Sequence, residues 1–399
     1  MALMPVAEAL THILGRVQRL GAESVIIQEA AGRTLNGPLV SALTNPPFDV
    51  SSMDGYGLRA ADIAKLPATL DLIGESAAGW PFAGTVGPGQ AVRIFTGAPV
   101  PDGADTVVIQ EETRAEGNRV AVLKATPKGA NIRLRGQDFH DGDIVLDDGR
   151  RLSPRDIMLA AASGHGLLAV TRKPVVAILA TGDELVEPSD RPMAAQIVAS
   201  NSYGLAALIE AAGGEPRLVG IAQDTPESLA QKIAEAAGAD ILVTTGGASV
   251  GDHDLVRPAL ETAGAKLDFW KIAMRPGKPT FFGTLGAMRV LGLPGNPLSA
   301  MLGARIFLSP LIAKMLGRTD EFKTFKAVLA TPLAANGPRD HYMRAALDTA
   351  SVPPRVTPQP SQDSSLIKAF SDAQCLIIIP ANAPAQDAGS EVVAMMMDY

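Results

Sequence analysis

A glycine-rich segment followed by acidic side chains, ILVTTGGASVGDHD at residues 241–254, has the composition of a ligand-binding loop. Gly246 and Gly251 have the spacing of a P-loop, but Asp252 and His253 stand where that motif requires Lys and Ser or Thr. The G-x-G-x-x-G dinucleotide fingerprint is also absent. Backbone N–H groups in such a loop suit an anion, whereas nearby carboxylates repel one by roughly 4 kcal/mol at about 4 Å and an effective dielectric near 20. Mg²⁺ would remove this conflict; the alternative is a solvated acidic turn.

Further carboxylates follow other expected strands. Asp183 and Glu184 lie in ATGDEL after one strand, Asp224 begins the helical segment DTPESLAQKIAEAAG, and Asp254 follows the glycine loop. Carboxylates gathered at one edge of a sheet would suit a hard metal ion. Asp224 has a second possible role as the N-cap of a capping box with Glu227.

A basic cluster occurs in WKIAMRPGKP. In an extended segment, Lys271 and Arg275 would lie on one side, with Lys278 in the following turn. Three neighbouring cations repel one another unless an oxyanion or phosphate lies among them. The alternative is a solvated basic turn formed at Pro276-Gly277.

Two turn-rich segments give weaker indications of a binding site. In LPGNPLSAM, Asn296 is the expected N-cap and Pro297 the first residue of a helix whose free N–H groups either hold an anion or simply begin the helix. In NPPFDVSSMDGYG, which contains Asp49 and Asp54, the Asp54-Gly55 pair predicts a hairpin turn.

The elements that position these residues become regular from Val175 onward. Strand-like VVAILATGDEL, EPRLVGIAQ, ADILVTTGG and KLDFWKIAM alternate with helical SNSYGLAALIEAAGG, DTPESLAQKIAEAAG and HDLVRPALETAG, and a long helix begins at NPLSAM. Such alternation predicts a parallel sheet with crossover helices, which binds ligands beyond the carboxyl ends of its strands. The loops ATGDEL, AQDTPE, TTGGASVGDHD, RPGKP and LPGNP should therefore share one rim.

The remaining segments predict mainly β structure. The first 170 residues contain short strand-like runs such as GQAVRIFTGAPVP and DTVVIQEE, which indicate an inserted all-β lobe. Residues 152–165 predict a helix with Ser153 as N-cap and Pro154 at its first position. After Asp320, short proline-containing runs predict a small terminal β-domain.

Composition limits the class of protein. The 399-residue chain has 35 Lys and Arg against 42 Asp and Glu, a net charge of −7 that argues against a nucleic-acid partner. Its single cysteine, Cys375, excludes an intrachain disulfide framework. No apolar run predicts a membrane span. The N-terminal Glu8, His12 and Arg16 have the spacing of an amphipathic helix, which distinguishes this segment from a signal peptide and favours a cytoplasmic location.

Six segments in this order resemble those of the molybdopterin molybdenumtransferases, the MoeA proteins, which are similar to the E domain of gephyrin. They are SSMDGYG, RIFTGAPVP, ATGDEL, TTGGASVGDHD, RPGKP and GLPGNPLS, and the resemblance spans nearly the whole chain. It implies a homodimer and a multidomain α/β and β fold with a central doubly wound α/β domain of the molybdopterin-binding type. The implied parts are a mixed α+β scaffold (1–45 and 136–172), an inserted β-domain (46–135), the α/β domain (173–319) and a β-barrel-like C-terminal domain (320–399).

The resemblance also implies an activity. MoeA proteins take adenylylated molybdopterin and molybdate, insert the metal into the dithiolene and release AMP with the help of Mg²⁺, at a site shared between two subunits. Two alternatives are molybdopterin adenylylation, whose enzymes resemble only the isolated α/β domain, and a non-catalytic scaffold of the gephyrin type, for which this chain has no fused second domain or long linker.

Site residues follow from the matching motifs. The resemblance implies catalytic roles for Asp54, Thr96, Asp183, Glu184, Asp224 and Asp254, the last four as candidate Mg²⁺ ligands. Expected substrate contacts are Gly246, Gly247, Ser249, Gly251, Lys271, Arg275, Lys278, Pro294, Asn296, Pro297, Arg344, Ser364 and Ser365. Asp138 is a further matching position. RPGKP departs from the more usual KPGKP, so the guanidinium of Arg275 replaces a compact ammonium. TTGGASVG also replaces a more usual SGGVSVG.

Overall fold

The computed structural model describes residues 3–247, 255–319 and 323–397. The chain divides into two compact units, each of which is considered separately. The first comprises residues 1–23, 32–36 and 170–399, and the second comprises residues 24–31 and 37–169. Strands β1 (Ala22–Ile26) and β12 (Leu167–Thr171) run across the boundaries between these units along the chain.

The first unit contains a six-stranded sheet in which five strands run in the same direction and one runs opposite to them. Its order is β16 (Glu215–Ala222), β13 (Val175–Thr181), β17 (Ile241–Thr245), β21 (Met288–Leu293), β20 (Phe281–Leu285) and β18 (Lys266–Trp270). Strand β20 is antiparallel to both of its neighbours. The expected parallel sheet with crossover helices is thus confirmed for β16, β13, β17 and β21, and β20 is an antiparallel strand near one end. Only Gly286 and Ala287 connect β20 to β21, and so short a connection permits only a hairpin.

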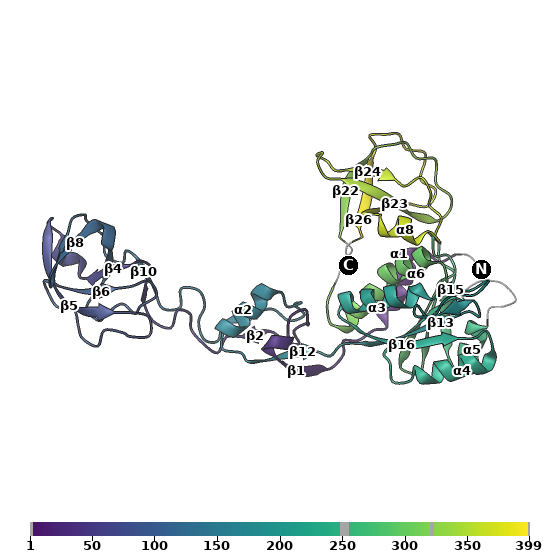
Figure 1. Cartoon of the computed structure of the whole chain (residues 1–399), viewed down its shortest axis with the longest axis horizontal. Helices are drawn as coiled ribbons and strands as arrows, with labels where there is room; N and C mark the ends of the chain where they lie inside the picture. Colours follow the sequence, from purple (N-terminus) through teal and green to yellow (C-terminus); the bar gives the residue numbers. More distant parts are fainter. Residues whose placement is uncertain (1–2, 248–254, 320–322, 398–399) are drawn as a thin grey trace. The chain divides into compact units, whose positions relative to one another are not determined.

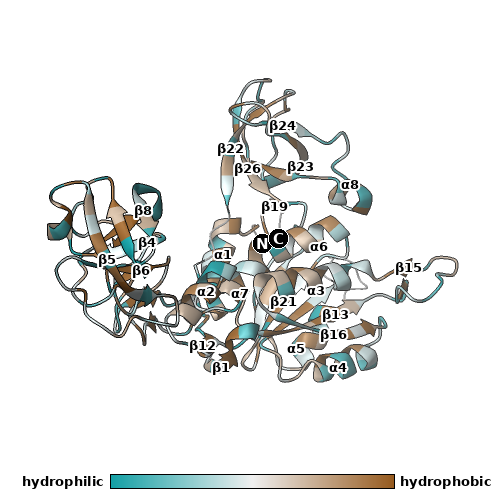
Figure 2. Ribbon diagram, turned by 60° about the vertical axis from the view of Figure 1, so that its left-hand side comes forward, coloured by the Kyte–Doolittle hydropathy of each residue, from teal (hydrophilic) through white to brown (hydrophobic). Residues whose placement is uncertain are grey.

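Helices cover both faces of this sheet (Figure 1). One face packs against α1 (Val6–Gly15), α3 (Ser200–Ala212), α6 (Pro297–Gly303), a π-helical turn (Ala304–Leu308) and α7 (Ser309–Met315). The other face packs against α4 (Pro226–Glu235) and α5 (Val256–Thr262). Figure 2 shows the corresponding contrast between hydrophobic strands and the hydrophilic parts of α4.

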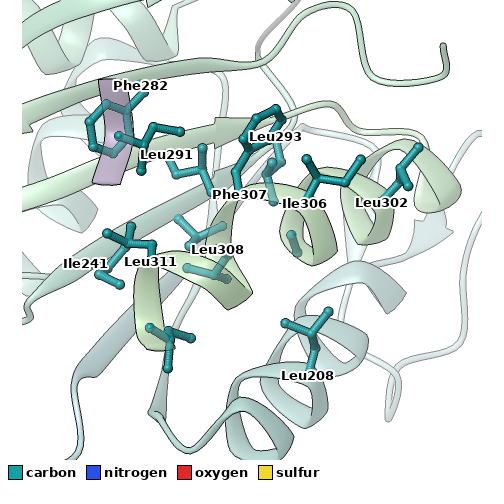
Figure 3. Close-up of a cluster of buried hydrophobic side chains, with 14 of the residues drawn as sticks. Leu208, Ile241, Phe282, Leu291, Leu293, Leu302, Ile306, Phe307, Leu308 and Leu311 are labelled. Atoms are coloured by element: carbon teal, nitrogen blue, oxygen red, sulfur yellow. The ribbon is translucent and has the colours of Figure 1, made fainter. Parts of the chain in front are cut away.

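The continuous helix Pro297–Met315 forms much of the first hydrophobic core. Ile306, Phe307, Leu308 and Leu311 point from it toward strand residues such as Leu291 (Figure 3). Among the described residues, this helix alone is long and apolar enough to cross a membrane, but 78% of its apolar window is buried inside the protein. Packing against the sheet thus accounts for its composition.

Helix ends confirm most of the expected capping residues. Ser153 caps α2 (Pro154–Ala162) in a capping box with Asp156, with Pro154 in the first turn. Asn296 occupies the N-cap position of α6, and Gly213 ends α3 with a left-handed φ of 93°. The expected cap at Asp224 was wrong by one residue, because the side chain of Thr225 accepts the Ser228 N–H.

The C-terminal part of the first unit is a closed β-barrel. Its ring contains β23 (Asp340–Asp348), β24 (Arg355–Pro358), β22 (Thr324–Leu329), β26 (Glu391–Met396) and β25 (Cys375–Ile379), which pairs back with β23. The short strand β19 (Met274–Arg275) adds to β23, and α8 (Ile367–Ser371) completes this part. Cys375 is buried in the barrel core, as its apolar surroundings in the sequence predicted.

The second unit contains the expected β lobe. Its six-stranded sheet has the order β7 (Thr106–Ile109), β4 (Gly55–Leu58), β6 (Gln90–Ile94), β5 (Ala68–Ser76), β9 (Arg119–Val122) and β8 (Thr113–Glu116). Two-stranded pairings join β3 (Val50–Ser51) to β10 (Ile132–Arg133), and β2 (Leu39–Val40) to β11 (Ile144–Leu146).

The predicted hairpin at Asp54-Gly55 was wrong. Strand β3 pairs with β10, while Gly55 opens β4 and lies between β6 and β7. A Cβ atom at Gly55 would lie 1.9 Å from the Val108 carbonyl oxygen. Glycine is therefore required at Gly55 because a neighbouring strand passes too close for a side chain.

Candidate active site

The described parts of the loops predicted to share a rim lie at one edge of the sheet. Register places the ends of neighbouring strands side by side, pairing Ala222 with Thr181, and Thr245 with Leu293. On the other side, Phe281 at the start of β20 pairs with Trp270 at the end of β18. Because β20 runs antiparallel, its first residue and the last residue of β18 lie at the same edge as the other carboxyl ends. This edge carries the acidic, basic, glycine-rich and proline-rich loops.

Two glycines begin the glycine loop because no side chain fits there. A Cβ at Gly246 would lie 2.5 Å from the Thr181 carbonyl oxygen, and one at Gly247 would lie 2.2 Å from Val256 Cγ2. Both residues have positive φ, 90° and 56°. The N–H of Gly246 donates to the Leu293 carbonyl at 3.3 Å. These contacts hold the start of the loop against the adjacent strand ends; the expected Ser249, Gly251 and Asp254 lie outside the described residues.

The acidic loops approach each other at the rim. Asp183 Oδ1 accepts the backbone N–H of Asp224 at 3.0 Å, so two of the four expected carboxylate residues are neighbours. Asp183, Glu184 and Asp224 are all exposed. Within residues 3–247, 255–319 and 323–397, no three His, Cys, Asp or Glu side chains gather into a metal-binding group.

This donor set is compatible with Mg²⁺. Carboxylate oxygens are hard ligands, and Mg²⁺ is commonly held by one or two carboxylates together with water and substrate phosphates. The neighbouring Asp183 and Asp224 supply such oxygens on an exposed rim.

The basic loop leaves the sheet at Trp270 and returns at Phe281. Its base is closed by the Lys271 N–H, which donates to the Thr280 carbonyl, and by the Ile272 N–H, which donates to the Lys278 carbonyl. Lys271 has a φ of 77°, so the expected strand ends at Trp270 and its alternation does not extend to Arg275. The Lys271 ammonium lies 4.1 Å from the centre of the Trp270 ring.

Arg275 and Lys278 are exposed. Arg275 and a second arginine, Arg339, both lie close enough to His341 to act on its charge. Arg275 pairs with His341 across β19 and β23. Burial, followed by the charges of Arg275 and Arg339, lowers the pKa of His341 to about 4. His341 is therefore neutral at pH 7 and adds no positive charge beside the exposed guanidinium of Arg275.

The proline-rich loop joins the rim to the C-terminal barrel. The Asn296 side chain donates to Ser364 Oγ at 2.9 Å, and the Leu298 N–H donates to the Ser364 carbonyl at 3.0 Å. Pro294 and Pro297 flank this contact, as the sequence LPGNPL requires. Ser365 donates through its backbone and its hydroxyl to Asp363 Oδ1. The structure thus brings the predicted Ser364 and Asn296 together.

Arg344 has a different position from the one expected for a direct oxyanion contact. It is fully buried, and its guanidinium donates to the carbonyls of Ser361, Asp363 and Leu366 at 2.8–3.1 Å. Burial lowers the pKa of Arg344 below its ordinary value. These bonds fold the loop that carries Ser364, so the described role of Arg344 is to hold that loop.

The second unit places two distant predicted residues in contact. Asp54 Oδ1 accepts the Thr96 N–H at 2.7 Å and the Thr96 hydroxyl at 2.8 Å. These hydrogen bonds, the backbone one first, lower the pKa of Asp54 from its ordinary value. Both residues are exposed, so an ionised carboxylate is presented at the surface. Asp138 lies apart from this pair and accepts the Asn45 side-chain amide at 3.2 Å.

Sequence reasoning missed two polar residues beside these clusters. Asn201, in the first turn of α3, donates to the Gly295 carbonyl at 2.7 Å and so fixes the proline-rich loop. Arg93 lies 5.0 Å from the ring centres of both Tyr56 and Phe95 and donates to the Gly55 carbonyl. For Arg93, a charged residue within the apolar run AVRIF was the available indication, whereas Asn201 lies between two serines and gave none.

The fold and these loops define a molybdopterin-binding α/β domain combined with β-domains. The MoeA N-terminal region (domain I and II) matches residues 4–164, the "probable molybdopterin binding domain" matches residues 177–314, and the MoeA C-terminal region (domain IV) matches residues 326–396. Crystal structures of the molybdopterin biosynthesis MoeA protein from Pyrococcus horikoshii superpose with a TM-score of 0.86 at 28–30% identity, covering 99–100% of this chain and 100% of theirs.

Curated relatives carry one name. The molybdopterin molybdenumtransferase of Nostoc sp. is 41% identical over 82% of this chain and 77% of its own length, and that of Haemophilus influenzae is 35% identical over 93% and 92%. The chain belongs to the MoeA family of molybdopterin molybdenumtransferases and is a transferase of molybdenum cofactor biosynthesis. The residue borders expected for its four domains stay a prediction.

Proposed function

We propose that this transferase inserts molybdenum from molybdate into adenylylated molybdopterin and releases AMP. The observation that carries the proposal is the shared rim, on which carboxylates, a glycine loop, a basic loop and a helix N-terminus meet at one edge of the α/β sheet. A pterin nucleotide has phosphates for the N–H groups, and molybdate is a tetrahedral dianion that suits neighbouring cations.

Three groups of residues would divide the work. The glycine loop and the first turn of α6 would bind phosphates through backbone N–H groups. Lys271, Arg275 and Lys278 would hold molybdate beside the dithiolene, whose sulfurs belong to the pterin. This arrangement explains why a chain with a single buried cysteine can handle the metal.

Mg²⁺ would be held by Asp183, Glu184, Asp224 and Asp254, directly or through water, and would neutralise charge on the phosphates. The same carboxylates would orient the water that attacks the phosphoanhydride. Attack on phosphorus breaks the bond between AMP and the molybdopterin phosphate, and the proton lost by the water passes to a carboxylate or to solvent. In this scheme cleavage takes place only when molybdate is present, so the release of AMP is coupled to metal insertion.

We further propose that the working unit is a homodimer, in which the Asp54–Thr96 pair of one subunit serves the rim of the other. The pair presents an exposed, ionised carboxylate with a depressed pKa, which suits a site completed by a second surface. The proposed location is the cytoplasm, and no nucleic acid or membrane partner is proposed.

AMP release from adenylylated molybdopterin, measured with and without molybdate at several Mg²⁺ concentrations, tests the reaction. Molybdate-dependent release supports insertion. Formation of adenylylated molybdopterin from molybdopterin and ATP, with release of pyrophosphate, would indicate adenylylation, and no turnover would indicate a scaffold. Lys278→Ala should raise the molybdate requirement about ten- to a hundredfold, since loss of a charge-assisted hydrogen bond costs about 1.5–3 kcal/mol. Weaker pterin-nucleotide binding with unchanged molybdate dependence would assign the basic loop to phosphate instead.

Subunit mixing tests the shared site. Asp54→Ala and Asp254→Asn subunits should each be inactive alone, whereas heterodimers should regain one complete site and up to half of the wild-type activity per dimer. Heterodimers that form but stay inactive would show that Asp54 and Asp254 of one site come from the same subunit.

A further inference from the structure

Trp80 is the most exposed aromatic side chain in the part of the chain that the structure describes. Its exposed fraction is 80%. Tryptophan buries a large apolar area when it is covered, so leaving it in water sacrifices considerable stabilisation. The other tryptophan, Trp270, is partly buried and packs against Arg257 and Lys271. The exposure of Trp80 leaves its indole available to a ligand or partner.

The backbone presents Trp80 on a rigid turn. Ala77 and Trp80 form an isolated antiparallel bridge with two hydrogen bonds of 2.9 Å, and Gly79 between them has a φ of 80°. Beyond the turn, the Phe82 ring packs so closely on Gly74 that a Cβ there would lie 2.4 Å from it. The backbone is thus fixed on both sides of Trp80, so binding at this turn requires little further ordering of the main chain.

This turn leaves the sheet at the same strand ends as the Asp54–Thr96 pair. Ser76, the last residue of β5, pairs with Ile94 of β6, and Ile94 also pairs with Gly55 of β4. The Phe95 N–H donates to the Ser76 carbonyl, so Ala77 lies level with Phe95, one residue before Thr96. Phe95 is one inter-strand distance from Ala77, and Ala77 is one bridge distance from Trp80. The Trp80 backbone therefore lies on the order of 10 Å from that of Phe95.

A second apolar side chain lies at this edge. Met53 is 47% exposed and immediately precedes Asp54. Its backbone is fixed by the Ser51 hydroxyl, which donates to the Met53 carbonyl at 2.6 Å. Small-molecule sites typically combine apolar walls with a few placed polar groups. Trp80 and Met53 supply such walls, and Asp54 and Thr96 supply the polar groups.

We propose that Trp80 stacks on a planar nitrogen heterocycle of the substrate, the pterin or the adenine of the adenylylated pterin. An isolated indole on a fixed turn of small residues fits a flat ring, whereas a protein interface would require a larger apolar surface around it. The neighbours along the turn are Ala77, Ala78, Gly79 and Pro81. This inference rests on the proposed function, and it assigns to the inserted lobe the binding of a ring in addition to the contribution of Asp54.

Binding measurements on the full-length protein test the stacking. Equilibrium binding of AMP and of adenylylated molybdopterin would be compared for wild type, Trp80→Ala, Trp80→Phe and Leu123→Ala. Stacking of a heterocycle on an aromatic side chain predicts about a five- to hundredfold loss of affinity for Trp80→Ala and less than about fivefold for Trp80→Phe. Leu123 is also half exposed, but it follows β9 at the opposite end of the sheet, where Val122 pairs with Ala68. Leu123→Ala should leave both affinities unchanged.

Fluorescence gives a direct readout of contact. The chain has two tryptophans, so the emission lost in Trp80→Phe belongs to Trp80. Ligand binding should quench that component and protect it from acrylamide. Quenching by AMP would identify adenine as the stacked ring, and quenching by the adenylylated pterin alone would identify the pterin.

Three outcomes would overturn the inference. One is an unchanged affinity of Trp80→Ala for both ligands, and another is binding without any change in Trp80 emission. The third is dissociation of Trp80→Ala into monomers by analytical ultracentrifugation, because Trp80 would then be a subunit contact. A different result would refute the proposed reaction, namely the absence of molybdate-dependent AMP release from the wild-type protein.

Discussion

Gly246→Ala should displace the start of the glycine loop and destabilise the α/β domain. The new Cβ would lie 2.5 Å from the Thr181 carbonyl oxygen and 2.8 Å from Thr181 Oγ1. Neither atom moves easily, because Thr181 ends β13, which is paired on both sides by β16 and β17. The substitution therefore combines steric overlap with a left-handed backbone conformation.

The two contributions can be separated with a matched glycine. Gly238 has a similar φ of 79°, but a Cβ there would meet no heavy atom within 4 Å. Gly238→Ala should thus cost only the left-handed conformation, about 1–2 kcal/mol. Gly246→Ala adds overpacking of about 1–3 kcal/mol, which gives about 2–5 kcal/mol in total.

Urea unfolding of both variants in a Trp80→Phe background measures this difference. Trp270, at the end of β18, then reports on the α/β domain alone. Gly246→Ala should lose at least about 1 kcal/mol more than Gly238→Ala, and under conditions where it remains folded it should release AMP at least about tenfold more slowly. Equal destabilisation of the two variants would refute the argument that Thr181 confines the loop.

Three further changes test individual contacts. Thr96→Val removes the hydroxyl bond to Asp54 and should raise the pKa of that carboxyl toward its ordinary value, so the acid limb of the pH–rate profile should move to higher pH. Asp240→Asn should lower the free energy of unfolding by about 1–3 kcal/mol at pH 7, because Asp240 accepts two bonds of 2.6 and 2.7 Å from Arg172. Burial raises the pKa of Asp240, but the Arg172 and backbone hydrogen bonds outweigh it and lower that pKa overall, so this stabilisation should be complete above about pH 4 and disappear as the pH falls further. Arg275→Lys should raise the molybdate requirement if the guanidinium binds the oxyanion through two N–H groups, and unchanged molybdate dependence would show that charge alone suffices.

Local patterns in the sequence determined the architecture around the rim. Alternating strand and helix periods predicted the α/β domain, and the end of each strand predicted the loop that follows it. Asn296 and Pro297 marked the start of a helix because capping depends on a few adjacent residues. The shared edge followed, since a right-handed crossover returns each parallel strand in the same direction.

Tertiary structure decided what local patterns could not. Asp54 and Thr96 are 42 residues apart, and Asn296 and Ser364 are 68 apart, so only the pairing of strands and the docking of the barrel bring them into contact. The left-handed Lys271 ended an expected strand where the chain leaves the sheet for the barrel. Arg344 turned inward because three carbonyls of a folded loop accept hydrogen bonds from its two terminal nitrogens, a packing outcome that no short-range spacing encodes.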